Sequence, residues 1–271
     1  VWSSTSSTSS TAHSYPSDKT YETIRTRHSS TGAIHEKRVL TRLEHFVHGH
    51  DQWRALTDYL GELISTVCGP MVLYKEKLNL KPPGGSGFAP HLDTPSLRVA
   101  LGPEGPQDFV TVMVAIDAMT ETNGCLRVAP GPYTEDNCVA TIAPDPNGNP
   151  DANGRAGAIP LEVADATLEF ETMTCPGGTV VAFSGWVPHR SSANQSLFAR
   201  RAVFFTYNPA RQGDFHVAYY QHMEQLRNQW RARVGLSTND AGAANVSTPQ
   251  PAGLTPDEQA ELNALATIPR I

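Results

Sequence analysis

The spacing of hydrophobic residues changes along the chain and separates a helical region from a β region. Within residues 35–69 the apolar side chains recur every three or four positions, at Trp53, Leu56, Tyr59, Leu60, Leu63, Ile64 and Val67. This is the spacing of an amphipathic helix. Asp51 stands where it can cap the start, and Gly69-Pro70 ends the pattern. One amphipathic helix is therefore expected here.

From Met71 onward the pattern changes to short runs rich in β-branched and aromatic residues, separated by Gly/Pro clusters. Four of these runs predict strands, at residues 72–81, 109–117, 179–183 and 201–207. A helix is expected over residues 214–234, and Thr255-Pro256-Asp257-Glu258 resembles a capping box ahead of a short final helix. Helices combined with many short strands are typical of an α+β protein with a sandwich or jelly-roll core.

The chain divides into three parts by composition. Residues 1–30 are expected to form a Ser/Thr-rich N-terminal tail, because such a composition buries too little apolar surface to fold alone. Residues 31–235 are expected to form the folded domain, and residues 236–271 a C-terminal extension. The Gly/Asn/Asp/Pro-rich segment 143–160 has no periodicity, which favours a surface insertion or a lid over the active site.

Composition narrows the classes of partner. The 271 residues are 39% hydrophobic and carry a formal charge of −6 without a basic run, so nucleic acid is not an expected partner. The most apolar stretch, 109–116, is too short to cross a bilayer, which argues against a membrane protein. Four cysteines without a C-x-x-C pair indicate a reducing, cytoplasmic location. We expect a small-molecule substrate and keep a homodimer open.

The tripeptide His91-Leu92-Asp93 is the sharpest local signal of chemistry. Residues two apart in an extended segment point to the same side, so this imidazole and this carboxylate can face one metal ion. His189 follows a predicted strand and is the candidate third ligand. Two histidines and one carboxylate that leave metal positions open form the facial triad of non-haem Fe(II) oxygenases.

Arg200 and Arg201 open a strand of aromatic and β-branched residues. A cation buried in such a strand is costly unless it meets an anion, and a guanidinium holds a carboxylate through two hydrogen bonds. Strand parity puts Arg200 on one face with Ala202, Phe204 and Thr206, where the small residues leave room for a bound acid. Arg201 is expected to point the other way.

A longer set of residues around His189 resembles a known family. The segment 188–194, with the sequence Pro-His-Arg-Ser-Ser-Ala-Asn, is followed by Arg200 and by a strand that ends Tyr207-Asn208-Pro209. This arrangement resembles the phytanoyl-CoA dioxygenase family of Fe(II)/2-oxoglutarate-dependent oxygenases. Segments 75–79, 84–93 and 123–126 look most like its 2-aminoethylphosphonate dioxygenase branch. The resemblance covers roughly residues 33–211.

The resemblance implies a double-stranded β-helix (jelly-roll, cupin-like) core with flanking helices. It also implies Fe(II), 2-oxoglutarate as cosubstrate and O2. His91, Asp93 and His189 would then be the iron ligands, and Arg200 would bind the distal carboxylate of 2-oxoglutarate.

Strand parity adds weaker site candidates. Ser191 shares the face of His189, and further 2-oxoglutarate candidates share one face of their strand: Lys77, Asn79 and Lys81. For the lysines at positions 75, 77 and 81, a solvated strand edge is the alternative. Candidates for the substrate pocket are Phe88, Thr94 and Trp186; for Phe88 and Trp186 a place in the core is equally compatible.

The expected reaction is oxidation of an aliphatic C–H bond of a small amine-bearing molecule, an aminophosphonate or an amino acid, with hydroxylation as the default outcome. Ring closure or desaturation in natural-product biosynthesis is the alternative with the same cofactors. An acidic ligand at Asp93 fills the position that chloride takes in the related halogenases, which disfavours halogenation. A zinc hydrolase would leave Arg200 without a role, and a non-catalytic small-molecule binding protein would not need the four residues together.

Overall fold

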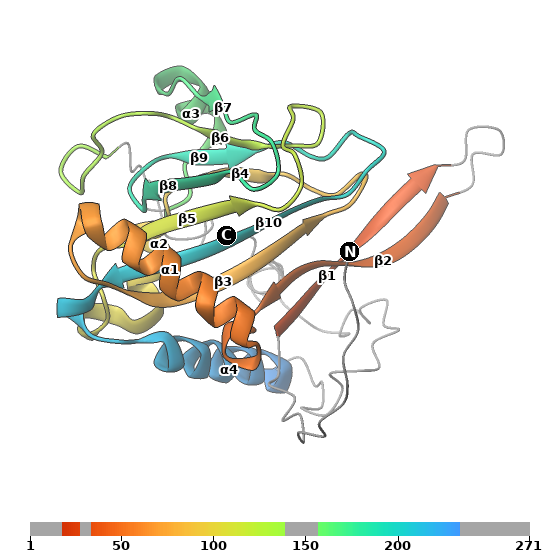
Figure 1. Cartoon of the computed structure of the whole chain (residues 1–271). Helices are drawn as coiled ribbons and strands as arrows, with labels where there is room; N and C mark the ends of the chain where they lie inside the picture. Colours follow the sequence, from red (N-terminus) through yellow and green to blue (C-terminus); the bar gives the residue numbers. More distant parts are fainter. Residues whose placement is uncertain (1–17, 28–33, 139–156, 234–271) are drawn as a thin grey trace, which may run out of the picture.

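The computed structural model describes residues 18–27, 34–138 and 157–233 (Figure 1). Its strands are β1 (Asp18–Arg27), β2 (Ile34–Glu44), β3 (Met71–Lys81), β4 (Phe88–His91), β5 (Val110–Ala115), β6 (Leu126–Val128), β7 (Glu171–Thr172), β8 (Val180–Ser184), β9 (His189–Ser191) and β10 (Arg200–Pro209). Its helices are α1 (Asp51–Cys68), α2 (Asp93–Leu101), α3 (Leu161–Thr167) and α4 (His216–Arg233), with short 3-10 turns η1 (Val47–Gly49), η2 (Gly102–Glu104) and η3 (Ala210–Gln212).

Two antiparallel sheets face each other. A six-stranded sheet has the order β1-β2-β3-β10-β5-β8, and a four-stranded sheet has the order β4-β9-β6-β7. From β3 onward the chain passes from one sheet to the other at nearly every step, and the first strand of this series, β3, pairs with the last, β10. This winding is that of a double-stranded β-helix. The expected α+β fold with a jelly-roll core and flanking helices is confirmed.

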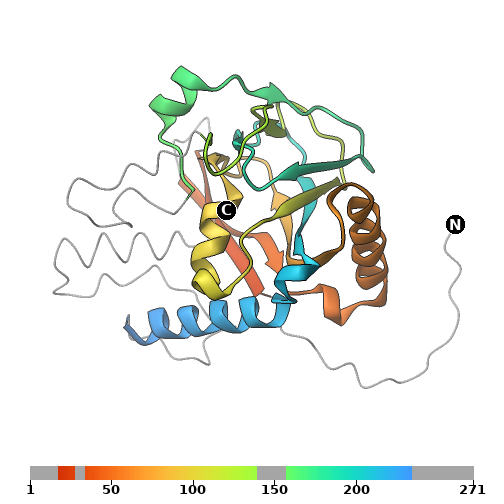
Figure 2. The ribbon, with the colours of Figure 1, turned by 90° about the vertical axis from the view of Figure 1, so that its left-hand side faces the viewer.

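Helix α1 covers the outer face of the six-stranded sheet (Figures 1 and 2). Leu60 and Ile64 of α1 pack against alternate residues of β10, namely Val203, Phe205 and Tyr207. The Tyr207 hydroxyl donates a hydrogen bond to the carbonyl oxygen of Thr57 in the helix at 2.8 Å. The intervening residues of β10 therefore face the interior between the two sheets, as the period of two requires.

The expected helix at 51–68 is confirmed, but its start differs in detail. The N-cap residue is His50, and Asp51 is the first helical residue. Its carboxylate forms an ion pair with Arg54 in the first turn instead of capping the helix. An acidic residue at this position still interacts favourably with the helix dipole.

The N-terminal region contains a strand that was expected to be tail. Residues 18–27 form β1, which pairs with β2 from Asp18↔Glu44 to Arg27↔Ile34. Strand β2 then pairs with β3, so the hairpin extends the six-stranded sheet. The tail boundary at residue 30 is therefore wrong for residues 18–27. Polar residues dominate both strands, so neither shows the apolar alternation that a sequence pattern requires.

The other expectations about helices and strands are partly confirmed. The four strands expected after Met71 correspond to β3, β5, β8 and β10, and the helix expected at 214–234 corresponds to α4. Helix α2 begins inside the His91-Leu92-Asp93 motif and was not foreseen. Residues 1–17, the first part of the segment 143–160, the C-terminal extension 236–271 and its capping box lie outside the described residues.

The cysteines and helices add two observations. Cys68, Cys125, Cys138 and Cys175 are all free thiols, in line with the absence of a disulfide pattern in the sequence. None of the helices in the described part of the chain is both long enough and apolar enough to span a membrane.

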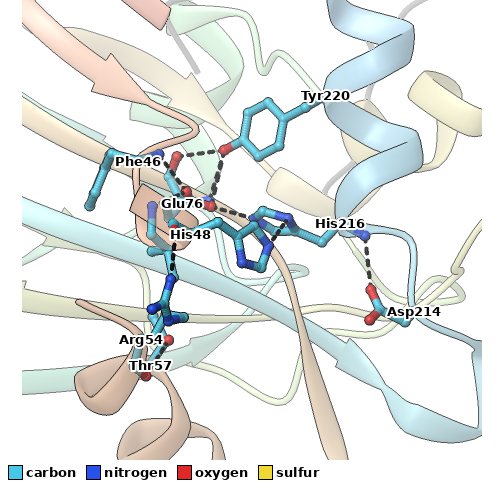
Figure 3. A network of polar contacts seen from close by, with 9 residues as sticks. Phe46, His48, Arg54, Thr57, Glu76, Asp214, His216 and Tyr220 are labelled. Carbon is cyan, nitrogen blue, oxygen red and sulfur yellow. Dashed lines mark hydrogen bonds and ion pairs between the residues drawn. The ribbon is translucent and has the colours of Figure 1, made fainter. Parts of the chain in front are cut away.

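A buried carboxylate ties three elements together outside the barrel (Figure 3). Glu76 on β3 is fully buried, and one of its oxygens accepts hydrogen bonds from the backbone N–H groups of Phe46 and Val47 at 2.8 and 2.9 Å. His216 Nε2 lies 2.7 Å from the other oxygen, and the Tyr220 hydroxyl donates to the Glu76 carbonyl at 2.8 Å. The network therefore joins η1 and α4 to the central strand β3.

Burial would raise the pKa of Glu76, but the hydrogen bonds from His216 and from the backbone outweigh it and hold the pKa below its ordinary value of 4.5. The helical spacing of His45 and His48, without a nearby Cys or Glu partner, predicts exposed side chains, but both rings lie at this network instead. The His48 ring nitrogen Nε2 is 3.0 Å from His216 Nδ1, and the His45 ring stacks on Tyr220 with centroids 4.2 Å apart.

We predict that Glu76→Gln lowers the free energy of unfolding by about 3 kcal/mol at pH 7, because it removes one partner of a buried charged network. Glu62→Gln on the exposed side of α1 is the control and should change it little. Since the folded-state pKa of Glu76 is depressed, its contribution is present above pH 4.5 and is lost as the pH falls through the lower value. Denaturant unfolding at several pH values measures this. Equal effects of the two substitutions at pH 7 would contradict the assignment.

Candidate active site

The three candidate metal ligands come from the ends of neighbouring elements. His91 is the last residue of β4, Asp93 is the first residue of α2, and His189 is the first residue of β9. Strands β4 and β9 are antiparallel, with His91 directly opposite His189. This pairing brings together two residues that lie far apart in the sequence, with their ring centroids 4.1 Å apart.

The ligand atoms of the three side chains converge on one point. Asp93 Oδ1 lies 3.8 Å from His91 Nε2 and 3.8 Å from His189 Nε2. All three side chains are buried, and one ligand atom from each lies within 4.8 Å of the others. Sequence spacing therefore identified a set of residues that the fold brings into one cluster.

Neighbouring groups fix the orientation of each ligand. His91 Nδ1 lies 2.7 Å from the carbonyl oxygen of Ala89, and His189 Nδ1 lies 3.0 Å from that of Val187. A carbonyl only accepts, so each Nδ1 carries the proton and each Nε2 presents its lone pair to the centre.

The carboxylate is oriented in a similar way. The Thr111 hydroxyl on β5 donates to Asp93 Oδ2 at 2.9 Å and lies 3.2 Å from the Thr206 hydroxyl on β10. This leaves Asp93 Oδ1 directed at the two histidines. Neither threonine was identified from the sequence, because a lone Thr on a strand carries no signal of its contact.

The chemistry of this donor set fits a divalent metal ion such as Fe(II). Two of the ligand atoms, His91 Nε2 and Asp93 Oδ1, are buried without a hydrogen-bond partner in the described part of the chain. Burial lowers the pKa of His91 to about 3, with a smaller contribution from His189, and burial also lowers the pKa of His189. Burial opposes ionisation of Asp93, but His189, Lys77 and His91 hold its pKa below its ordinary value. Two neutral imidazoles and one carboxylate are what such an ion requires.

The ligands open onto a pocket between the two sheets. The pocket has a volume of about 380 Å³ and is lined by Lys77, Asn79, Phe88, His91, Leu126, His189, Arg190, Ser191, Arg200 and Phe204. Six of the residues selected from the sequence for the metal or the cosubstrate line this one pocket: His91, His189, Arg200, Ser191, Asn79 and Lys77.

Arg200 and Lys81 form a cationic pair beside this pocket. Arg200 is 3% exposed, and its guanidinium donates to the carbonyl oxygen of Gly124. Lys81 Nζ donates to the same carbonyl at 3.1 Å and to the Ser191 hydroxyl at 2.9 Å. Arg200 Nε is buried without a partner among the described residues. Two adjacent cations that contact only neutral oxygens are suited to an anion.

The pKa shifts of Arg200 and Lys81 agree with a role in binding an anion. Burial lowers the pKa of Arg200 to about 10, and burial together with Arg200 lowers the pKa of Lys81 to about 7. Arg201 points to the opposite face, where it is exposed and binds Asp117 through two hydrogen bonds of 2.8 and 2.7 Å. Strand parity therefore assigned the two arginines to the correct faces.

Gly124 allows the close approach of these groups. Its φ of +70° lies in the region that favours glycine, and a Cβ atom there would be 2.2 Å from the Ser192 carbonyl oxygen and 3.0 Å from Lys81 Nζ. In the sequence, Gly124 belongs to segment 123–126, one of the segments that resemble the 2-aminoethylphosphonate dioxygenase branch. Its contact with both cations could not be read from the motif.

The lysines of β3 are not at a solvated strand edge. Lys75, Lys77 and Lys81 are 5%, 6% and 4% exposed, and β2 and β10 pair with the two edges of β3. Asn79, which shares their face, has a buried Oδ1 without a partner in the described residues. The solvated-edge alternative is therefore wrong for these residues.

The three candidates for the substrate pocket lie in different surroundings. Phe88 lines the pocket, and its ring centroid lies 5.7 Å from Lys81 Nζ. Thr94 is fully buried in α2, where its backbone N–H donates to the Gly185 carbonyl at 2.9 Å. Trp186 packs against the cluster that contains Leu92, with the Arg98 guanidinium 4.9 Å from its ring centroid. The structure places Thr94 and Trp186 outside the lining of the pocket.

Three relatives of known activity are similar to this chain. A 2-aminoethylphosphonate dioxygenase from an uncultured bacterium (HF130_AEPn_1) is 36% identical over 191 residues, which cover 68% of this chain and 65% of the relative. A methylphosphonate hydroxylase from Gimesia maris is 35% identical over 56% of this chain and 50% of its own length. An L-proline trans-4-hydroxylase from Streptomyces griseoviridis is 30% identical over 52% and 55%. The chain thus spans between half and two thirds of these relatives.

A family model gives the same relationship over a longer range. The model described as phytanoyl-CoA dioxygenase (PhyH) matches residues 9–202, which is more than half of the 271 residues. The matched range includes His91, Asp93, His189 and Arg200. This chain belongs to the phytanoyl-CoA dioxygenase family.

Proposed function

We propose that this protein is an Fe(II)- and 2-oxoglutarate-dependent oxygenase that oxidises an aliphatic C–H bond of a small amine-bearing substrate. The observation that carries the proposal is the arrangement around one pocket of a buried His-Asp-His set and a buried Arg200–Lys81 pair. The first group supplies metal ligands and the second supplies the partner of an acid. Each group contains buried polar atoms that lack a protein partner in the described residues.

His91, Asp93 and His189 would hold the iron, and their surroundings would keep them ready to do so. The carbonyls of Ala89 and Val187 hold the imidazoles in one tautomer, and Thr111 holds the carboxylate. When bound, iron with 2-oxoglutarate and O2 supplies the oxidising power for the C–H bond, while 2-oxoglutarate is converted to succinate and CO2. The protein contributes position and the exclusion of water.

Arg200, Lys81 and Ser191 would bind the distal carboxylate of 2-oxoglutarate. Their polar atoms meet around the Gly124 carbonyl and leave donors available on the guanidinium. An anion in this place would stabilise the charged form of Lys81, which burial otherwise disfavours. Asn79 lies farther along β3 toward the metal ligands and would contact the other end of the cosubstrate.

The substrate class rests on the relatives and on charge. Two of the similar proteins are named for 2-aminoethylphosphonate and L-proline, both small molecules with an amino group. The chain carries a charge of −6 and lacks a basic run that could receive the phosphates of coenzyme A. Hydroxylation is the default outcome, and ring closure or desaturation is the alternative.

The free cysteines support a cytoplasmic location.

Two other functions use part of the same site. A zinc hydrolase would use the three ligands but would leave Arg200 buried without an anionic partner in the described residues, and a binding protein would not need oriented metal ligands. Oxygen consumption that requires both Fe(II) and 2-oxoglutarate separates the proposed oxygenase from both. Asp93 as a ligand also disfavours halogenation.

We expect His91→Ala and His189→Ala each to abolish stoichiometric Fe(II) binding and turnover, because two remaining ligands hold a divalent ion poorly. His50→Ala, at an exposed position whose side chain makes no cap hydrogen bond, is the control. Anaerobic iron titration by calorimetry and an activity assay measure the effect, and circular dichroism checks the fold. Near wild-type iron binding in either variant would show that the ligand assignment is wrong.

Arg200→Met should raise the KM for 2-oxoglutarate by about 30-fold or more, since loss of a charge-assisted pair of hydrogen bonds costs on the order of 2 kcal/mol. Arg201→Met removes an identical charge from the neighbouring position and should leave this KM within about twofold, because Arg201 is exposed. Steady-state kinetics with varied 2-oxoglutarate give both values. A larger effect at Arg201 would reverse the assignment.

The substrate class can be tested by succinate release from a panel of 2-aminoethylphosphonate, simple aliphatic amino acids, L-proline, betaines and phytanoyl-CoA. Turnover of at least one amine-bearing compound is expected. Mass spectrometry of the product then distinguishes hydroxylation, which adds one oxygen atom, from ring closure or desaturation, which adds none. Turnover of the thioester alone would contradict the proposed class.

A further inference from the structure

The inner face of the six-stranded sheet holds more charge than metal and cosubstrate binding uses. Beyond Asp93, Arg200 and Lys81, four buried charged side chains of the adjacent strands β2 and β3 share this face: Arg42, Glu44, Lys75 and Lys77. The register of these strands places Arg42 beside Asn79 and Glu44 beside Lys77. Strand β2 therefore places two charges beside Asn79 and Lys77, which line the metal pocket.

Lys75 and Lys77 form no ion pair with an anion within the part of the chain that the structure describes. In the described ranges no hydrogen bond or salt bridge involves the Nζ atom of either residue. Lys75 Nζ lies 5.6 Å from the ring centroid of Tyr219, and Lys77 Nζ lies 5.2 Å from that of Phe204. Such contacts compensate only part of the cost of removing an ammonium from water.

The carboxylates nearest the lysines also face other groups. Glu44 lies 3.8 Å from Arg42, and Asp93 directs its free oxygen at the two histidines. A dication bound to Asp93 would also repel the ammonium groups of Lys75 and Lys77, because it would reverse the sign of the nearest charge. An anion beside Lys75 and Lys77 would compensate both the burial and this repulsion.

The distal carboxylate of the cosubstrate does not supply this anion, and the other end of the cosubstrate, placed near Asn79 and the metal ligands, would be shared with the metal ion. Lys77 and Lys81 are four residues apart on an extended strand, a separation of roughly 13 Å between their Cα atoms. Lys81 lies with Arg200 and Ser191, whereas the charge that acts most strongly on Lys77 is that of Asp93. Lys77 thus belongs to the metal end of the pocket and Lys81 to the end where the distal carboxylate would bind.

We propose that Lys75 and Lys77 form the binding site for an anionic group of the substrate, a carboxylate or a phosphonate, and that Glu44 receives its amino group. This proposal rests on the proposed oxygenase function and assigns Lys77 to the substrate instead of to 2-oxoglutarate. Lys77 lines the same pocket as His91 and His189, so a substrate held there presents its carbon chain to the metal site. The N-terminal hairpin, which carries Glu44, becomes part of the recognition surface for a small zwitterion.

Matched ligands test the anion requirement. Anaerobic calorimetry on the Fe(II)- and 2-oxoglutarate-loaded protein compares 2-aminoethylphosphonate with ethylamine, and L-proline with pyrrolidine, so that each pair differs in the anionic group. We expect at least one anionic member to bind at least tenfold more tightly than its partner. Binding of neither anionic probe, or equal affinities within both pairs, would overturn the proposal.

Matched variants test the residues. Lys75→Met and Lys77→Met should each weaken the anionic probe at least tenfold and leave the Kd for 2-oxoglutarate within threefold, whereas Arg200→Met should show the reverse order. Lys37→Met, at an exposed position on β2, is the control. Lys77→Arg keeps the charge and should restore part of the affinity. Glu44→Gln should weaken the amine-bearing probes without changing 2-oxoglutarate binding.

The experiments distinguish a wrong lysine assignment from a wrong oxygenase function. If Lys77→Met weakens 2-oxoglutarate as much as Arg200→Met does, or leaves the anionic probe unchanged, the lysine assignment is wrong while the oxygenase proposal stands. If the wild-type protein binds neither Fe(II) nor 2-oxoglutarate, the proposed function itself is wrong. Replacement of a buried, unpaired lysine by an apolar side chain of similar length is expected to preserve folding, and thermal unfolding of each variant verifies this.

Discussion

The interior of this β-sandwich contains charged and polar atoms that the described protein groups do not satisfy, and the arrangement of the pocket depends on this electrostatic constraint. His91 Nε2, Asp93 Oδ1 and Arg200 Nε are buried without partners in the described residues, and the ammonium groups of Lys75 and Lys77 face aromatic rings. Groups of this kind are expensive to bury and are normally paired. Their concentration around one pocket is most simply explained by bound ligands that complete the pairing.

The fold sets where these groups meet. The jelly-roll winding places β4 and β9 side by side in one sheet and β3 and β10 side by side in the other. The first pair brings His91 opposite His189, and the second brings Lys81 opposite Arg200. The outer face of the same sheet packs against α1 and the Glu76 network, so a packed apolar and polar layer supports the face proposed to bind ligands.

Sequence reasoning identified the parts of this arrangement that follow a local rule. The H-x-D spacing and the period of two along β10 depend only on backbone geometry, and the structure shows both: the ligand atoms converge and Arg200 and Arg201 face opposite ways. Contacts between distant segments could not be predicted in this way. The Thr111 hydrogen bond, the shared Gly124 carbonyl and the pairing of β2 with β3 all depend on tertiary structure. Strand β1 was missed because its polar residues show no alternation.

The central claim is that the buried polar groups of the pocket are completed by a metal ion and a dicarboxylic cosubstrate. An anaerobic calorimetric titration of the wild-type chain, first with Fe(II) and then with 2-oxoglutarate, tests it most directly. The account predicts one iron per chain, followed by one 2-oxoglutarate whose binding is strengthened by the iron. A chain that binds iron but not 2-oxoglutarate, or that binds 2-oxoglutarate equally well without any metal, would contradict it.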